Sequence, residues 1–275
     1  TISVTGTGNT INSGTGTALN IASTTIGAGN LNFQSISHNG GANSIVLNTT
    51  GATGGLTISG TGSANSGGTI QNTTSHGILL TATISPSFNN LRISGTTRSG
   101  IKGTMVNNFS FTNGTIEFSG VTSGGTVVGS QSDSHIAFND GSFGTPTTLE
   151  QSLTGVVTIT GNTFNTAYYE GIDLFNYQGT ISNANISNNI FTSGATATNS
   201  KGSAVRIIAS GGAANTANLT KATLDNNVIT GFPSGAGIFV SSNNGTPGAP
   251  GSTMGIPGSA TDIIAITNNR IRGFS

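Results

Sequence analysis

The stretch YYEGIDLFNY, residues 168–177, holds the side chains of this chain that are best suited to chemistry. Its carboxylates, Glu170 and Asp173, are close enough in sequence to come within the roughly 5 to 10 Å that catalytic acid pairs need in glycoside-cleaving enzymes. The tyrosines beside them have flat faces that suit stacking on sugar rings, and a guanidinium follows further along the chain. The candidate binding residues are therefore Tyr168, Tyr169, Glu170, Asp173, Tyr177 and Arg206.

A structural interpretation of the same residues is simpler. If Asp173 and Arg206 take equivalent outward positions on neighbouring turns of a repeating fold, they form a surface ion pair. Such a pair contributes under ~1 kcal/mol to stability. The tyrosines would then pack over an edge of the fold. We favour this interpretation and assign no catalytic residue.

Histidine and metal chemistry have weaker support. His135 lies between Asp133 and Asp140 in DSHIAFND, a combination that suits a metal site or a general base. However, the chain has three histidines, none at ligand spacing from another, and it has no cysteine. Its eight carboxylates are scattered and form no Asp-rich calcium repeat. We therefore expect neither a metal ion nor a cofactor.

The composition excludes several classes of protein. Only 6% of the residues are charged and the net charge is zero, which argues against nucleic-acid binding, because phosphates need clustered cations. There is no apolar run of ~18 residues, so no membrane-spanning segment is expected. The absence of cysteine is compatible with export. Because the sequence starts without a methionine or signal peptide, we interpret it as part of a longer chain.

The chain also repeats itself. Three segments near its C-terminal end share an asparagine pair, two earlier ones share a single asparagine, and all five place an apolar residue five positions after the first one. These segments begin at Phe111, Ile159, Ile186, Leu224 and Ile266. A second pattern consists of an apolar residue, any residue, and an apolar or small residue. Its copies begin at Leu19, Ile45, Ile78, Ile101, Ile136, Ile172, Val205 and Ile238.

These runs are short, alternate with period two and are bounded by Gly, Asn or Ser, which are strand signals. The sequence thus predicts an all-β, parallel β-solenoid of about eight or nine coils, a rod of roughly 40 Å. We expect residues 1–275 to form one solenoid domain, with protruding loops near 120–153 and 241–261. An antiparallel β sandwich is the alternative fold.

The asparagines extend this prediction. Asparagine tolerates left-handed backbone and bonds to the local backbone, so Asn162, Asn189, Asn227 and Asn269 can stack at one bend of successive coils. This pattern resembles the asparagine ladder of the right-handed parallel β-helices of the pectate-lyase-like superfamily. The resemblance implies right-handed winding but no particular activity. The blocks NTD, DD, GHG and RIK of its polygalacturonase-like hydrolases do not occur in this sequence.

The chain is also similar to the β-helical passengers of bacterial surface and secreted proteins. From this similarity we expect an extracellular or cell-surface structural or adhesive module, whose solenoid ends contact neighbouring coils or identical subunits. Surface glycans are a further possible partner. The alternative is a protein that binds or cleaves a polysaccharide through the surface around Tyr168 to Tyr177 and Arg206.

Overall fold

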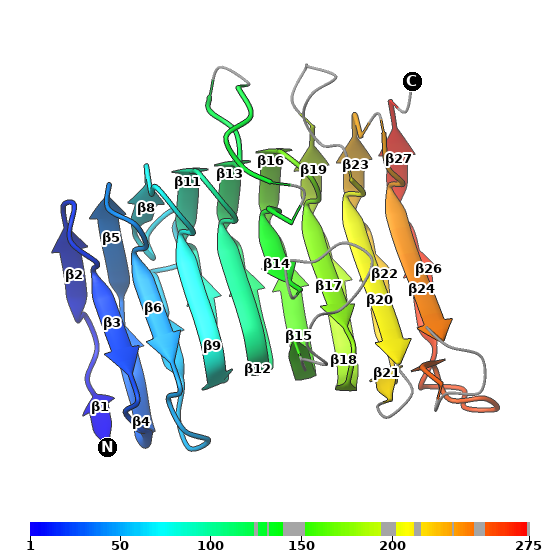
Figure 1. Cartoon of the computed structure of the whole chain (residues 1–275), viewed down its shortest axis with the longest axis horizontal. Coiled ribbons are helices and arrows are strands. Elements are labelled where there is room, and N and C mark those ends of the chain that lie inside the picture. The colour runs from blue at the N-terminus through cyan, green and yellow to red at the C-terminus, as the bar shows by residue number, and fades with distance from the viewer. Residues whose placement is uncertain are drawn as a thin grey trace.

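The computed structural model describes residues 1–123, 126–130, 132–139, 152–193, 202–211, 216–232, 234–244 and 251–273. In these residues the chain winds into successive coils that stack side by side (Figure 1). The strands form one sheet of 18 strands and one of nine, and every pairing in both sheets is parallel. This confirms the predicted parallel β-solenoid, and the antiparallel sandwich is wrong.

The smaller sheet contributes one strand to each coil, so its nine strands correspond to nine coils in the described part of the chain. Its strands are β2 (Thr10–Ser13), β5 (Ser35–Asn39), β8 (Thr69–Gln71), β11 (Arg92–Thr96), β13 (Thr115–Ser119), β16 (Thr163–Ala167), β19 (Ile190–Thr192), β23 (Val228–Thr230) and β27 (Arg270–Arg272).

The larger sheet bends around the rod, because strands such as the long β12 run through two of its faces. Its strands are β1 (Ile2–Val4), β3 (Leu19–Ala22), β4 (Ile26–Phe33), β6 (Ile45–Asn48), β7 (Leu56–Ile58), β9 (Ile78–Ile84), β10 (Ser87–Asn89), β12 (Ile101–Thr112), β14 (Ile136–Phe138), β15 (Leu153–Thr160), β17 (Ile172–Asn176), β18 (Gly179–Ser187), β20 (Val205–Gly211), β21 (Ala217–Leu219), β22 (Ala222–Asp225), β24 (Ile238–Asn244), β25 (Thr253–Met254) and β26 (Ile264–Thr267).

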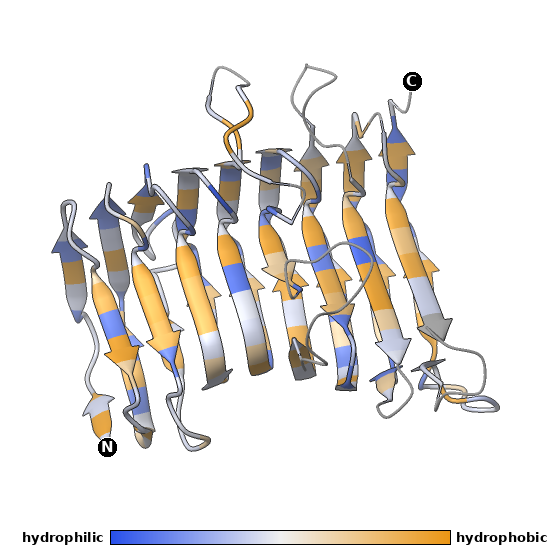
Figure 2. Ribbon diagram, viewed as in Figure 1, coloured by the Kyte–Doolittle hydropathy of each residue, from blue (hydrophilic) through white to orange (hydrophobic). Residues whose placement is uncertain are grey.

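The core consists of the columns that the sequence pattern predicts. The paired apolar residues stack from β3 to β24 in one register, and the residues around the asparagines stack in two further columns. Inside the rod these side chains are fully buried, and Figure 2 shows apolar bands that recur on successive strands. Gly103 interrupts one column because the Phe138 ring fills its place: a Cβ on Gly103 would lie 2.2 Å from that ring.

The buried bend between the two sheets is held by an asparagine ladder. The side-chain amide of Asn162 donates to the Oδ1 of Asn189 at 3.0 Å, Asn189 donates to Asn227 at 3.0 Å, and Asn227 donates to Asn269 at 2.9 Å. The backbone N–H of each donor residue bonds to the same oxygen, and each amide also donates to a carbonyl of the preceding coil. The side-chain amide and the backbone N–H of Asn162, Asn189 and Asn227 therefore all have partners.

The two asparagines of each pair have different tasks. The first residue of the pair takes the left-handed conformation, with φ of 58° at Asn188, 53° at Asn226 and 54° at Asn268. The second residue supplies the ladder. The sequence analysis predicted that one asparagine has both the left-handed backbone and the stacking amide. In the structure, the first asparagine of each pair has the left-handed backbone and the second has the stacking amide.

The protruding loops fall partly outside the described residues. Of the loop predicted near 120–153, positions 140–151 are not described, and of the loop near 241–261, positions 245–250 are not. The described part of the first loop includes an antiparallel bridge between Val121 and Val127. It projects from the end of β13 beyond the stack of coils (Figure 1).

We predict that Asn189→Ala lowers the free energy of unfolding by at least about 2 kcal/mol. The substitution leaves the buried N–H and amide of Asn162 without their acceptor, and unsatisfied buried donors cost about 1–3 kcal/mol each. Chemical denaturation followed by circular dichroism measures the loss. Asn20→Ala, at an exposed position on β3, is the control and should change stability by less than ~0.5 kcal/mol. Equal losses would show that the ladder does not stabilise the rod.

Candidate functional site

Three of the residues chosen from the sequence, Glu170, Asp173 and Arg206, meet at β17 and β20. Asp173 on β17 pairs in register with Arg206 on β20. The guanidinium binds the carboxylate through two parallel hydrogen bonds, from Nε to Oδ1 at 2.9 Å and from Nη2 to Oδ2 at 2.8 Å. The same Nε lies 3.3 Å from the Oε1 of Glu170. One arginine therefore joins both carboxylates.

This group is buried, unlike the expected surface pair. Asp173 is 0% exposed, Glu170 is 1% exposed and the Arg206 side chain is 11% exposed. Asn139, which follows β14 and is itself buried, donates a hydrogen bond from its amide to the Oδ2 of Asp173. Lys102 on β12 in turn donates to the backbone and side-chain oxygens of Asn139. The sequence predicted that Asp173 and Arg206 lie at equivalent positions of neighbouring coils, but it did not predict that both side chains are buried.

The geometry shows what the two carboxylates can do. Because a single nitrogen contacts both, they are as close as the acids of a glycoside-cleaving pair. However, the guanidinium occupies the space between them, where a scissile bond or a water molecule would have to lie. The arrangement is that of a buried ion cluster, and breaking such a cluster by removing one partner costs about 3–5 kcal/mol.

Burial changes the titration of the cluster. It is the main reason that the pKa of Glu170 rises from 4.5 to about 8, and the negative charge of Asp173 acts in the same direction. Arg206 and the hydroxyl of Ser134, which donates to Oε2 at 3.0 Å, oppose the rise only in part. At neutral pH Glu170 is therefore mostly protonated.

The three tyrosines do not form an open stacking surface. Tyr177 is 3% exposed and packs on Phe175, with 4.6 Å between the ring centroids. The guanidinium of Arg206 lies over the other aromatic ring of this pair, 5.5 Å from the Phe175 centroid. Tyr168 and Tyr169 are half-buried, with their ring centroids 6.2 Å apart. Two of the three rings thus keep some accessible surface.

His135 belongs to the core. It is 1% exposed, its Nδ1 lies 3.0 Å from the hydroxyl of Ser119, and its ring stacks on Phe164 at 5.8 Å. Burial lowers the pKa of the imidazole to about 3, so it is neutral at physiological pH. Within the described residues, no three acidic or histidine side chains are arranged to hold a metal ion.

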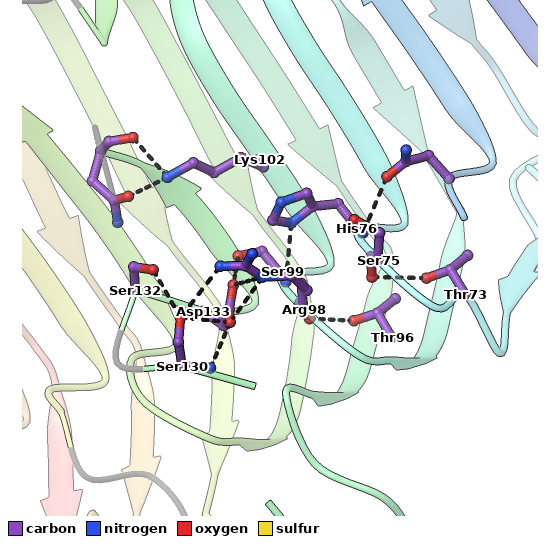
Figure 3. Close-up of polar contacts among 12 residues, drawn as sticks. Thr73, Ser75, His76, Thr96, Arg98, Ser99, Lys102, Ser130, Ser132 and Asp133 are labelled. Atoms are coloured by element: carbon purple, nitrogen blue, oxygen red, sulfur yellow. Dashed lines mark hydrogen bonds and ion pairs between the residues drawn. The ribbon is translucent and has the colours of Figure 1, made fainter. Parts of the chain in front are cut away.

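A second polar cluster, which the sequence did not suggest, surrounds Asp133 (Figure 3). This buried carboxylate accepts hydrogen bonds from the backbone N–H of Ser130 at 2.6 Å and from the Nε of Arg98 at 3.1 Å. His76 accepts one from the backbone N–H of Ser99 at 3.2 Å. Its pKa falls to about 4, mainly through burial, so this histidine too is neutral. The cluster fixes the irregular segment after β13 to the coil beneath it.

Comparison with known proteins gives no family for the chain. No protein-family model matches it, and neither the curated proteins nor the solved structures contain a match. In the part of the chain that the structure describes, no helix is long and apolar enough to span a membrane.

We predict that Glu170 makes stability fall as pH rises. Its folded-state pKa lies above the unfolded value, so its stabilising contribution is complete below pH 4.5 and is lost as pH rises through about 8. Because glutamine stays neutral at every pH, Glu170→Gln should reduce the loss of stability as pH rises. Thermal unfolding at pH about 5, 7 and 9 measures both slopes. Identical slopes would mean that Glu170 does not titrate in this way.

Proposed function

We propose that the chain is a structural or adhesive module of a secreted or cell-surface bacterial protein, and that its rod continues past the end coils into neighbouring coils or an identical subunit. The parallel coils and the asparagine ladder also favour a place among the right-handed β-helices of the pectate-lyase-like superfamily, in the form of a bacterial β-helical passenger. The observation that carries the functional proposal is the state of the two end coils.

The end coils leave part of the apolar core uncovered. In the middle of the rod, Ile78 and Leu80 are 0% exposed. Leu19 in the first coil is in the same column but only partly buried. In the last coil Ile266 is 51% exposed and Ile271 is 43% exposed, although the residues beneath them in their columns are fully buried. A further coil would bury these side chains, and each contributes ~1.5–3 kcal/mol when fully buried.

The first strands of the described residues carry neither charge nor proline to oppose pairing. Exposed edge strands are usually protected by charges, proline or bulges, because unpaired N–H and C=O groups attract other strands. Residues 1–91 contain no Asp, Glu, Lys or Arg, and the edge strands β1, β2 and β3 contain no proline. A bulge between Ile2 and Val4 is the one irregularity in their pairing with the next coil.

The two ends are compatible with each other. The C-terminal coil presents Ile238 and Val240 in the same column as Leu19 and Ile21 of the N-terminal coil, so a second copy can continue both the parallel strands and the apolar columns. The charged residues of β27 take the outward positions of Val228 and Thr230, away from the core column. Contact between unlike ends repeats without closing and produces a filament.

The composition agrees with this proposal, since a chain that is low in charge and free of cysteine suits export. A polysaccharide-binding or polysaccharide-cleaving protein is the alternative. It has less support because Glu170 and Asp173, its central residues, are buried against Arg206.

We predict that the purified protein forms filaments with an axial repeat of roughly 40 Å, the length of nine coils, visible by negative-stain electron microscopy. Ile266→Lys should abolish them by placing a charge on the end surface. Ile190→Lys is the matched control, since Ile190 is 47% exposed but lies on the flank of the rod, and it should leave the filaments intact. Discrete rods in the unmodified protein at every concentration, or filaments of the Ile266 variant, would contradict end-to-end assembly.

A further inference from the structure

Lys102, Asn139 and Asp173 form a row across three neighbouring coils. Their strands β12, β14 and β17 lie side by side, with Lys102 in register with Ala137, and Ala137 in register with Asp173. Asn139 comes two positions after Ala137 and contacts the lysine on one side and the aspartate on the other. The row therefore brings an amine, a primary amide and a carboxylate together, in that order.

The lysine amine is close to the amide carbon of the asparagine. Its Nζ donates to the side-chain Oδ1 of Asn139 and, at 2.6 Å, to the backbone oxygen of the same residue. Dashed lines in Figure 3 mark both contacts of Lys102. Because Oδ1 is one C=O bond of about 1.23 Å from Cγ, Nζ lies within about 4 Å of this carbon. Atoms that are about to react are roughly 3–3.5 Å apart, so a small rotation of the lysine side chain completes the approach.

The carboxylate lies on the opposite side of the amide. The Oδ2 of Asp173 accepts a hydrogen bond from the Nδ2 of Asn139, which is the atom that would leave if an amine attacked Cγ. Asn139 is 3% exposed and Asp173 is 0% exposed, whereas Lys102 is half-buried. Burial excludes water, which would otherwise compete with the lysine as the nucleophile.

Arg206 holds the carboxylate in place. Its guanidinium donates to Oδ1 of Asp173 at 2.9 Å and to Oδ2 at 2.8 Å. Two parallel bonds of this kind fix the plane of a carboxylate, and Oδ2 still accepts the bond from the amide nitrogen. A carboxylate that touches the leaving nitrogen is suited to move a proton during the reaction.

We propose that Lys102 and Asn139 join spontaneously through an isopeptide bond and that Asp173 catalyses this step. The uncharged amine attacks Cγ, and Asp173 takes a proton from Nζ and passes it to Nδ2. The Nζ–Cγ bond forms, the Cγ–Nδ2 bond breaks and ammonia leaves. In total, a lysine ammonium and a primary amide become a secondary amide and an ammonium ion, so no further reactant is needed. The bond lies within one chain, so this inference does not depend on end-to-end assembly.

The bond would connect two neighbouring coils covalently. The two residues are 37 positions apart in the sequence, so their union closes a loop of the chain. Such a crosslink stabilises a protein mainly by restricting the unfolded chain, as a disulfide does. This chain has no cysteine and cannot form a disulfide.

The mass of the denatured protein tests the proposal. We expect the unmodified protein to be lighter than its sequence mass by one ammonia, and a protease digest to contain the peptides of Lys102 and Asn139 joined to each other. Lys102→Arg keeps a cationic hydrogen-bond donor but lacks the nucleophilic amine, so it should have its full sequence mass. Lys221→Arg is the matched control at another lysine and should lose ammonia as the unmodified protein does.

Asp173→Asn tests the catalyst. The fraction that is folded by circular dichroism should keep its full sequence mass, because the side chain no longer takes up a proton. Any of four results would overturn the proposal: a full sequence mass for the unmodified protein, ammonia loss without joined peptides, ammonia loss in Lys102→Arg, or a folded Asp173→Asn chain that crosslinks as fast as the unmodified one. If Asp173→Asn does not fold, the unmodified protein and Lys102→Arg still decide whether the bond forms.

Discussion

The structure depends on satisfying backbone polar groups at bends that recur in every coil and are buried from water. A solenoid turns its chain at the same place again and again, so one unsatisfied N–H would be repeated along the whole rod. In the last four of the nine coils, the ladder through Asn162, Asn189, Asn227 and Asn269 meets this need, because each asparagine gives the one before it an acceptor in the next coil. With the bends fixed, the apolar residues on either side fall into register.

Much of the fold was predictable because it depends on local patterns that repeat. The period-two apolar pairs predict the inward columns, and the asparagine pairs predict the ladder. Both patterns lie within a few consecutive residues. The burial of Asp173 was not predictable in this way. Its buried hydrogen-bond partner, Asn139, follows β14 of the preceding coil, so no periodic signal connects the two residues. The same holds for Gly103, whose missing side chain is explained only by the distant Phe138 ring.

The candidate sites also differ in how far the sequence alone predicts them. The sequence drew attention to Glu170 and Asp173 because carboxylates, tyrosines and an arginine stood together, yet the fold buries both carboxyl groups against Arg206. The polar cluster around Asp133 carries no such motif, because Arg98 and Asp133 are 35 residues apart and meet only in the folded chain.

The parallel ladders between coils have a mechanical consequence. Their hydrogen bonds point along the rod, and each coil contacts only its two neighbours. Tension applied to the two chain ends would therefore load the terminal coil first and peel it from the next one, leaving the interior intact. The rod would lengthen in steps of one coil, and each freed coil would have the exposed strands of its neighbour as a template for rewinding when the load falls. Such a chain would act as an extensible tether that absorbs work without unfolding as a whole.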